Sequence, residues 1–323
     1  MAASAPEISV VIPTRDRWDL LSRTLAGALN QPGVEHEVVV VDDGSVDETP
    51  QRLTELRDPR LRVVRHSHPK QLAAARNAGI SAARGKWLAF LDDDDLWSPR
   101  KLRAQLDAAI AGGAIFAFSA GLTVDESRSV LRTQAVPEPE NLLRVLVGAN
   151  AIPVGASNVL ALTEVVRRLG GFDEELKHFA DWDLWIRLAA AGPAAVCREP
   201  HVAYVLHAKN MVLADQRGLV AEFRRLVAKH ELAASDYGVA PHRIVPDRSG
   251  IFRWLGWANA RGGRRVRAAR WYLRSALGRT RYGRRRSLGD AVLAVRGEIP
   301  EVSPHRPPDA EILRGAGWLG LYR

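Results

Sequence analysis

The sequence predicts an α/β fold with a mostly parallel sheet. In its first hundred residues, short and mostly apolar runs alternate with segments of helical periodicity. Such runs are typical of strands that helices cover on both faces. In addition, three of the four predicted strands end in polar or acidic residues, where open parallel sheets place their ligands. These observations together favour a doubly covered sheet with a ligand site at one edge.

The first four strands are predicted at residues 8–12, 38–41, 61–64 and 87–91. Leu21, Leu25 and Leu29 recur every four residues between the first two strands and predict a helix there. The alanine-rich segment 72–83 predicts a second helix. Ser98 and Pro99 supply an N-cap and a first-turn proline for the helix that follows the fourth strand.

The segment beyond residue 114 is less regular. We expect strands at 115–118, 157–162 and 202–206, a hairpin through 130–131, and helices at 141–147, 163–169 and 181–191. After residue 215 the pattern is nearly all helical, with two short helices meeting at Gly262 and Gly263. The domain prediction is a first half at 1–120, a second half at 121–240 and an arginine-rich helical extension at 241–323.

Basic residues are concentrated in the last quarter of the chain. Residues 241–323 hold 18 arginines, no lysine and 6 acidic residues, whereas the first 240 residues hold 28 basic and 31 acidic ones. Trp254, Trp257, Trp271 and Tyr272 lie among these arginines and would suit a lipid headgroup layer. This segment is therefore expected either to be a solvated face or to contact an anionic membrane surface or polyanionic acceptor, and nucleic acid is not expected.

The other bulk features favour a cytoplasmic protein. Cys197 is the only cysteine, so no internal disulfide can form, which fits a reducing compartment. No signal-peptide pattern is visible at the N-terminus. The uncharged stretches 111–124 and 145–163 are too short or too rich in Gly, Asn and Pro to span a bilayer. The expected location is the cytoplasm, peripherally at the inner face of the membrane.

Carboxylates cluster at the predicted strand ends. Asp42 and Asp43 follow the second strand and can accept hydrogen bonds from a base or a ribose. The run Asp92 to Asp95 follows the fourth strand and offers hard oxygen ligands for Mg²⁺ or Mn²⁺ shared with a diphosphate. Each motif alone also has a structural reading, as an Asp-Gly-Ser turn or as a solvated loop before a helix. Their placement at neighbouring strand ends favours a nucleotide site.

Several segments resemble motifs of glycosyltransferase family 2, an inverting family with the GT-A fold. They are VVIPTRDR (10–17), VVVVDDGSVDET (38–49), AAARNAGISAARGKWLAFLDDDDLW (73–97), and GGFDEEL with ADWDLWIRLAAAG (170–192). They stand in the family's order and, with HVAYVLHAKN (201–210), the resemblance covers about residues 7–210.

The resemblance implies that 1–120 is the nucleotide-sugar-binding half and 121–240 the acceptor-binding half of a GT-A domain, and it implies roles for individual residues. The nucleotide-sugar site would comprise Pro13, Thr14, Arg15, Asp42, Asp43, Arg76, Asn77 and Asp93. Asp92 and Asp94 would be nearest the metal, with the register open by one residue, and His207 would lie close to the metal or diphosphate. Asp181 matches the catalytic base, although Ala180 stands where the family usually has an acidic residue, which leaves Asp183 as an alternative.

The implied activity is metal-dependent transfer of a sugar from a nucleotide diphosphate sugar, with UDP as the expected nucleotide, to an acceptor hydroxyl by direct displacement. Two alternatives are a sugar-phosphate nucleotidyltransferase and a non-catalytic GT-A scaffold with a polyanion- or membrane-binding tail. The first lacks its glycine-rich phosphate loop after the first strand, where Pro13 to Asp16 stand instead. The acidic motifs, all present, argue against the second.

Overall fold

The computed structural model describes residues 5–207, 210, 216–233, 237, 248–277, 284–300 and 309–322. The chain divides into two compact units. Unit 1 comprises residues 1–146, 150–206 and 308–323, and unit 2 comprises residues 147–149 and 207–307. The chain therefore leaves unit 1 after Leu206, forms unit 2, and returns to unit 1 at Pro308.

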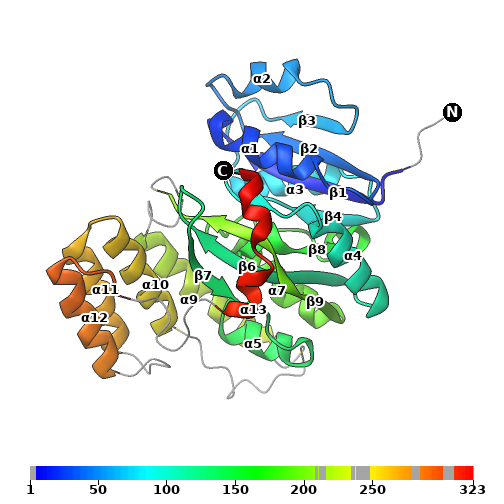
Figure 1. Cartoon of the computed structure of the whole chain (residues 1–323). Coiled ribbons are helices and arrows are strands. Elements are labelled where there is room, and N and C mark those ends of the chain that lie inside the picture. Colours follow the sequence, from blue (N-terminus) through cyan, green and yellow to red (C-terminus); the bar gives the residue numbers. More distant parts are fainter. Residues whose placement is uncertain are drawn as a thin grey trace. The chain divides into compact units, whose positions relative to one another are not determined.

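Unit 1 is built around a single sheet with the strand order β3-β2-β1-β4-β8-β6-β9-β5, and β7 pairs with β6 (Figure 1). The strands are β1 (Ile8–Thr14), β2 (His36–Asp42), β3 (Leu61–Arg65), β4 (Trp87–Phe90), β5 (Leu96–Trp97), β6 (Phe116–Val124), β7 (Val130–Gln134), β8 (Leu160–Leu162) and β9 (Ala194–Val205). The first four are parallel, as predicted. The other half is mixed, because β8 runs antiparallel to both β4 and β6 while β6 and β9 are parallel.

The helices of unit 1 are α1 (Trp18–Leu29), α2 (Thr49–Glu55), α3 (Leu72–Ala82), α4 (Lys101–Ala111), α5 (Leu142–Gly148), α6 (Thr163–Arg168), α7 (Ala180–Ala191) and α13 (Ala310–Arg314); the end of α5 counts with unit 2. Short 3₁₀ turns lie at η1 (Pro139–Asn141), η2 (Gly155–Asn158) and η4 (Gly317–Tyr322). Helix α3 packs on β1 and β2, and α4 packs on β6 and β9. Unit 2 contains α9 (Gln216–Ala233), α10 (Arg248–Arg261), α11 (Arg265–Leu277) and α12 (Arg284–Arg296).

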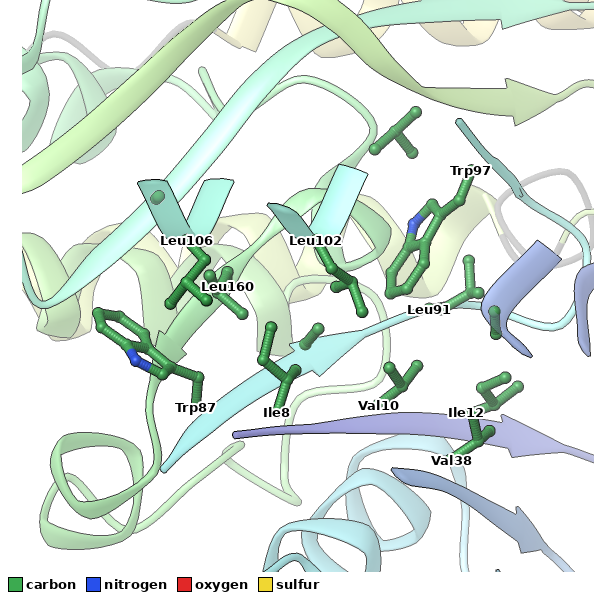
Figure 2. Packing of buried hydrophobic residues seen from close by; sticks show 14 of the residues in the cluster. Ile8, Val10, Ile12, Val38, Trp87, Leu91, Trp97, Leu102, Leu106 and Leu160 are labelled. Atoms are coloured by element: carbon green, nitrogen blue, oxygen red, sulfur yellow. The ribbon is translucent and has the colours of Figure 1, made fainter. Parts of the chain in front are cut away.

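The main hydrophobic core lies between the sheet and the helices that cover it. Figure 2 shows Ile8, Val10 and Ile12 of β1 pointing to one side of the strand, toward Leu102 and Leu106 of α4. All five side chains are fully buried. This alternation follows from the two-residue period of a strand. The fixed core holds the carboxyl ends of β1, β2 and β4 in register.

One predicted strand is shorter in the structure. The expected strand at 157–162 begins only at Leu160, because Ser157 and Asn158 belong to η2. The buried Asn158 side chain donates to the Ser119 carbonyl oxygen at 2.7 Å and accepts from the Ser119 amide at 2.9 Å. The side chain thus bonds the backbone of β6 in place of a longer strand pairing.

The C-terminal residues pack in unit 1. Ile312, Ala316 and Leu319 are buried in a second apolar cluster with Ala203 and Val205 of β9. The structure therefore differs from the predicted extension 241–323, since 308–323 belong to unit 1. The predicted boundary rests on the distribution of charge, and the apolar residues near the C-terminus do not affect that distribution. Among the described residues, no helix is long and apolar enough to cross a membrane.

Candidate active site

The predicted site residues converge at the carboxyl ends of three neighbouring strands. Thr14, the last residue of β1, pairs in register with Asp42, the last residue of β2. The Thr14 hydroxyl donates to Asp93 Oδ2 at 2.7 Å, and the Asp43 amide donates to the Thr14 carbonyl oxygen at 2.9 Å. Pro13 is buried in β1 beside Val41. The topology therefore gathers residues that lie up to eighty positions apart in the sequence.

The four aspartates alternate between partial exposure and burial. The Asp92 and Asp94 side chains are 30% and 10% exposed, whereas Asp93 and Asp95 are buried. Asp95 Oδ2 accepts from the Ser157 hydroxyl at 2.5 Å, and Oδ1 accepts from the Val205 amide at 3.3 Å. Burial and the neighbouring Asp94 and Asp92 carboxylates raise the pKa of Asp95 well above its usual value. Of the four aspartates, Asp92 and Asp94 thus have the more exposed side chains.

Asp93 is the buried aspartate nearest the strand ends. Burial, with the Asp94 carboxylate adding to it, raises the pKa of Asp93 to about 7, although Arg17 opposes the shift. Its two oxygens contact Thr14 and Arg17. A carboxyl group in this position can hold a proton near neutral pH and is less available as a metal ligand than its neighbours.

Two arginines balance the charge of the aspartate run. Arg17 Nη1 lies 3.1 Å from both Asp93 Oδ1 and Asp94 Oδ2. Arg76 Nη2 lies 2.5 Å from Asp92 Oδ1, and the Arg76 guanidinium is buried over the Phe172 ring. Arg76 was predicted at the site, but Arg17 was not. Arg17 stands at the start of α1, a position from which its long side chain reaches the neighbouring strand end.

Arg15 lies outside this cluster in the structure. Its side chain is 54% exposed and pairs with Asp16, with Nε 3.4 Å from Oδ2. Asp16 has a positive φ of 53° and accepts from the Val46 amide at 2.7 Å, which joins this loop to the turn after β2. The direct partner of the aspartates is therefore Arg17, two residues after the predicted Arg15.

Asp42 and Asp43 are buried and largely engaged by the protein. Asp42 Oδ1 accepts from the Ser45 amide at 2.9 Å, while Oδ2 faces Arg65 Nε at 3.3 Å without a hydrogen bond among the described residues. Asp43 Oδ1 accepts from the Lys70 amide at 2.9 Å and lies 2.7 Å from His66 Nδ1. Asp43 thus fixes the loop after β3, while the buried Asp42 Oδ2 is paired with the Arg65 guanidinium.

Asn77 holds a loop rather than pointing to the aspartates. Its side-chain nitrogen donates to the Phe172 carbonyl oxygen and to Glu174 Oε1, both at 2.9 Å, and its oxygen accepts from the Phe172 amide at 2.8 Å. This bonding ties α3 to the turn that contains Gly170 and Gly171. In this structure Asn77 therefore positions Phe172, on which Arg76 rests.

Asp181 lies in the first turn of α7, near the aspartate run. Its Oδ1 accepts from the Trp182 amide at 2.7 Å. Burial raises its pKa to about 6; Arg76 opposes this shift and Asp92 adds to it. A β-carbon at Gly155 would come within 2.7 Å of Asp181 Oδ2, so the backbone of η2 closes against this carboxylate. Asp181 is thus a partly buried carboxylate with an elevated pKa beside Arg76 and Asp92.

Asp183 points into the protein. It is fully buried, and its Oδ2 accepts from Arg187 Nε at 2.8 Å and from Arg187 Nη2 at 2.5 Å. Arg187 in turn donates to the carbonyl oxygens of Leu169 and Gly171. Asp183 therefore anchors α7 to the preceding turn, and of the two carboxylates Asp181 has the better placement for a base.

His207 belongs to unit 2, whereas the aspartates belong to unit 1. Its backbone amide donates to Asn210 Oδ1 at 2.8 Å, and its Nε2 lies 3.1 Å from Asn210 Nδ2. The predicted contact of His207 with the metal or diphosphate stays a prediction.

Comparison with known proteins supports the family resemblance over part of the chain. Residues 9–155 match the family model described as glycosyl transferase family 2. The chain is 34% identical over 216 residues to the succinoglycan biosynthesis protein ExoO of Rhizobium meliloti, covering 64% of this chain and 62% of ExoO. It is 25% identical over 183 residues to WfgD of Escherichia coli, a UDP-Glc:alpha-D-GlcNAc-diphosphoundecaprenol beta-1,3-glucosyltransferase, covering 56% of this chain and 69% of WfgD. The chain thus spans less than two thirds of the length of ExoO.

Solved structures share the fold. Residues 1–349 of S. aureus TarS, crystallised with UDP-GlcNAc, match with a TM-score of 0.61 at 18% identity, covering 90% of this chain and 81% of that one. The same fragment with UDP matches with a TM-score of 0.54. The fold and the sequence matches agree with the resemblance of the acidic motifs, and residues 9–155 are a glycosyl transferase family 2 domain.

Proposed function

We propose that this protein transfers a sugar from a nucleotide diphosphate sugar to an acceptor hydroxyl with inversion at the anomeric carbon. The observation that carries the proposal is the Asp181 carboxylate, which lies near Arg76 and Asp92 and has a pKa of about 6. A base for a sugar hydroxyl works best when its pKa approaches the working pH and it remains ionised. Asp181 meets both conditions at neutral pH.

The reaction is a single displacement. The acceptor oxygen forms a bond to the anomeric carbon while the bond from that carbon to the diphosphate oxygen breaks, and Asp181 takes the hydroxyl proton. Because attack and departure occur on opposite faces of the sugar, one displacement inverts the configuration. No second carboxylate is needed as a nucleophile, which agrees with the structural engagement of Asp183 by Arg187.

Asp92 and Asp94 are the proposed ligands for Mn²⁺ or Mg²⁺, with His207 as a further candidate. Both carboxylates are partly exposed, unlike Asp93 and Asp95. No group of three His, Cys, Asp or Glu side chains that could hold a metal occurs in the described part of the chain. One or two carboxylates fit a Mg²⁺-type ion that takes its other ligands from water and substrate phosphates. The ion would neutralise the departing diphosphate.

The nucleotide would lie along the ends of β1 and β2. Asp42, at the end of β2, is the proposed acceptor for a base N–H; its Oδ2 is buried with Arg65 Nε 3.3 Å away, and this side chain would move aside for the base. The surrounding pocket would be formed by Pro13, Thr14, Asp43 and Asp93, and its edge by Arg15 and Asn77. UDP is the proposed nucleotide; WfgD carries UDP-Glc in its name, and the TarS fragment was crystallised with UDP-GlcNAc.

The proposed compartment is the cytoplasm, and the proposed product is a glycan or glycoconjugate. The lone Cys197 supports a reducing compartment: it is partly buried, and burial raises the pKa of its thiol to about 11.

The test is a product assay on the purified protein. Incubation with Mn²⁺ and a panel of nucleotide sugars should release the nucleoside diphosphate from one donor, by slow hydrolysis or by transfer to an added acceptor. Release of pyrophosphate from a nucleoside triphosphate and a sugar phosphate would identify a nucleotidyltransferase instead. Donor turnover that is the same in wild type and Asp181→Asn would remove Asp181 from the role of base.

A further inference from the structure

Helix α11 carries a stripe of exposed aliphatic side chains. Val266, Leu273 and Leu277 lie seven and four residues apart, which places them on one helix face. Their exposed fractions are 64%, 45% and 79%. The opposite face of α11 is packed, with Ala268, Tyr272 and Ala276 buried.

Helix α12 repeats this arrangement. Leu288, Val292 and Val295 lie four and three residues apart, and their exposed fractions are 48%, 52% and 60%. Its other face is buried through Ser287, Asp290, Ala291 and Ala294. Both helices therefore already have a packed face within unit 2 and leave an apolar face exposed.

The two helices are antiparallel neighbours in unit 2 (Figure 1). Ser275 Oγ lies 3.3 Å from Ser287 Oγ, and a β-carbon at Gly297 would come within 2.5 Å of the Arg265 side chain. The end of α11 thus meets the start of α12, and the reverse. We call the exposed aliphatic side chains of these two neighbouring helices, taken together, the aliphatic face: Val266, Leu273, Leu277, Leu288, Val292 and Val295.

Arginines are frequent on the same two helices. Helix α11 contributes Arg265, Arg267, Arg270 and Arg274, and α12 contributes Arg284, Arg285, Arg286 and Arg296. Asp290 is the one acidic residue of these two helices, and it is buried in an ion pair with Arg253 of α10. The exposed surface of both helices is therefore cationic as well as apolar.

The aromatic residues do not belong to this surface. Trp257, Trp271 and Tyr272 are buried, and the Trp271 indole donates to Gln216 Oε1 at 2.7 Å. The expectation that Trp257, Trp271 and Tyr272 would reach a headgroup layer is therefore corrected, because they form the packing of unit 2, whereas Trp254 is half-buried. The side chains left to enter an apolar medium are aliphatic.

We propose that the aliphatic face and its arginines bind the surface of an anionic phospholipid bilayer. Aliphatic side chains are stabilised where they insert at the boundary between headgroups and acyl chains, and arginines attract anionic headgroups. A single anionic bilayer therefore offers a partner to both kinds of side chain. A second copy of this face would bring arginine against arginine. A nucleic acid backbone would satisfy the arginines but offer nothing to the aliphatic side chains.

Vesicle co-sedimentation tests the proposal with the full chain. The wild type should bind phosphatidylglycerol-containing vesicles at about 0.1 M salt and should leave pure phosphatidylcholine vesicles unbound. Leu273→Gln, Leu277→Gln and Leu288→Gln combined should weaken binding at least about tenfold without a change of charge. Leu56→Gln combined with Ile110→Gln is the matched control, because both are exposed aliphatic residues of unit 1, and it should bind as the wild type does.

Three results would overturn the proposal. One is wild-type affinity in the triple variant, since binding by arginines alone needs no aliphatic face. Another is an absence of binding to anionic vesicles by a folded wild type. The third is a wild type that is dimeric in light scattering and a triple variant that is monomeric, which would assign the face to a second copy. Circular dichroism verifies that the variants fold. Docking does not depend on the proposed sugar transfer, so nucleotide release measured without lipid should be equal in the wild type and the triple variant.

Discussion

Replacement of Asp181 by Asn should nearly abolish sugar transfer while leaving the nucleotide site intact. Asn keeps the shape and can still accept from the Trp182 amide, a bond of 2.7 Å in the structure, but it cannot take a proton. General base catalysis contributes roughly a hundredfold to ten-thousandfold, so transfer should fall by about a hundredfold or more. Calorimetric affinity for UDP with Mn²⁺ should change little.

The pKa of Asp181 adds a pH signature. With a pKa of about 6, the ionised fraction of the base should rise about tenfold between pH 5 and pH 8. Wild-type turnover should rise with pH accordingly, and the residual activity of Asp181→Asn should lack this step. A wild-type profile that is flat from pH 5 to pH 8, or an equally steep profile in the variant, would refute the assignment.

Turnover should rise with pH, whereas the contribution of Asp181 to the free energy of unfolding should fall with pH. Because the folded pKa of about 6 exceeds the ordinary value of 3.8, the folded state binds the proton more tightly than the unfolded state does. This group therefore lowers stability as the pH rises from about 4 to about 6. A shift of about two pKa units corresponds to at most about 3 kcal/mol. Asp181→Asn should thus raise the melting temperature at pH 8 and leave it nearly unchanged at pH 3.5, as measured by circular dichroism.

Three further variants test the rest of the site. Asp94→Ala should abolish the Mn²⁺ dependence of UDP binding in calorimetry, and equal wild-type affinity with and without Mn²⁺ would contradict a metal at this aspartate. Arg17→Met removes the guanidinium 3.1 Å from both Asp93 and Asp94, so Mn²⁺ should raise the melting temperature more in this variant than in the wild type. An unchanged thermal shift would show that Arg17 does not compete with a cation. Gly155→Ala places a β-carbon 2.7 Å from Asp181 Oδ2 and should lower transfer by about tenfold or more through the displaced base. Gly170→Ala has a similar positive φ but open space around it, and it should share the backbone strain without the loss of transfer.

The sequence predicted the first half of the sheet well because its signals are local. Each of β1, β2 and β4 is mostly apolar, and the polar residues at or just after its carboxyl end mark the ligand edge. The gathering of Thr14, Asp42 and Asp93 follows from parallel pairing alone. Contacts between distant segments leave no such local signal. The antiparallel direction of β8 was therefore not predicted, because it depends on packing between β4 and β6.

Arg17 and Asn77 show what sequence reasoning lacked at the site. Arg15 and Arg17 are both near the end of β1, and only the turn geometry, with Asp16 at a φ of 53°, decides which guanidinium reaches the aspartates. Asn77 lies in the motif expected near the nucleotide, but its hydrogen bonds go to the backbone of Phe172. A short motif specifies which residues are present, while the distant segment that they contact comes from the tertiary fold.

The return of the chain to unit 1 has a consequence for biosynthesis. The Tyr322 hydroxyl donates to the Trp97 carbonyl oxygen at 2.7 Å, across 225 positions of sequence, and the Trp318 indole donates to the Pro200 carbonyl oxygen at 2.9 Å. Because a ribosome delivers these residues after all of unit 2, unit 1 must wait for its last apolar segment with Ala203 and Val205 still uncovered. The nascent protein would be a client for chaperones during that interval, and a fragment that stops before residue 308 would keep this surface exposed permanently.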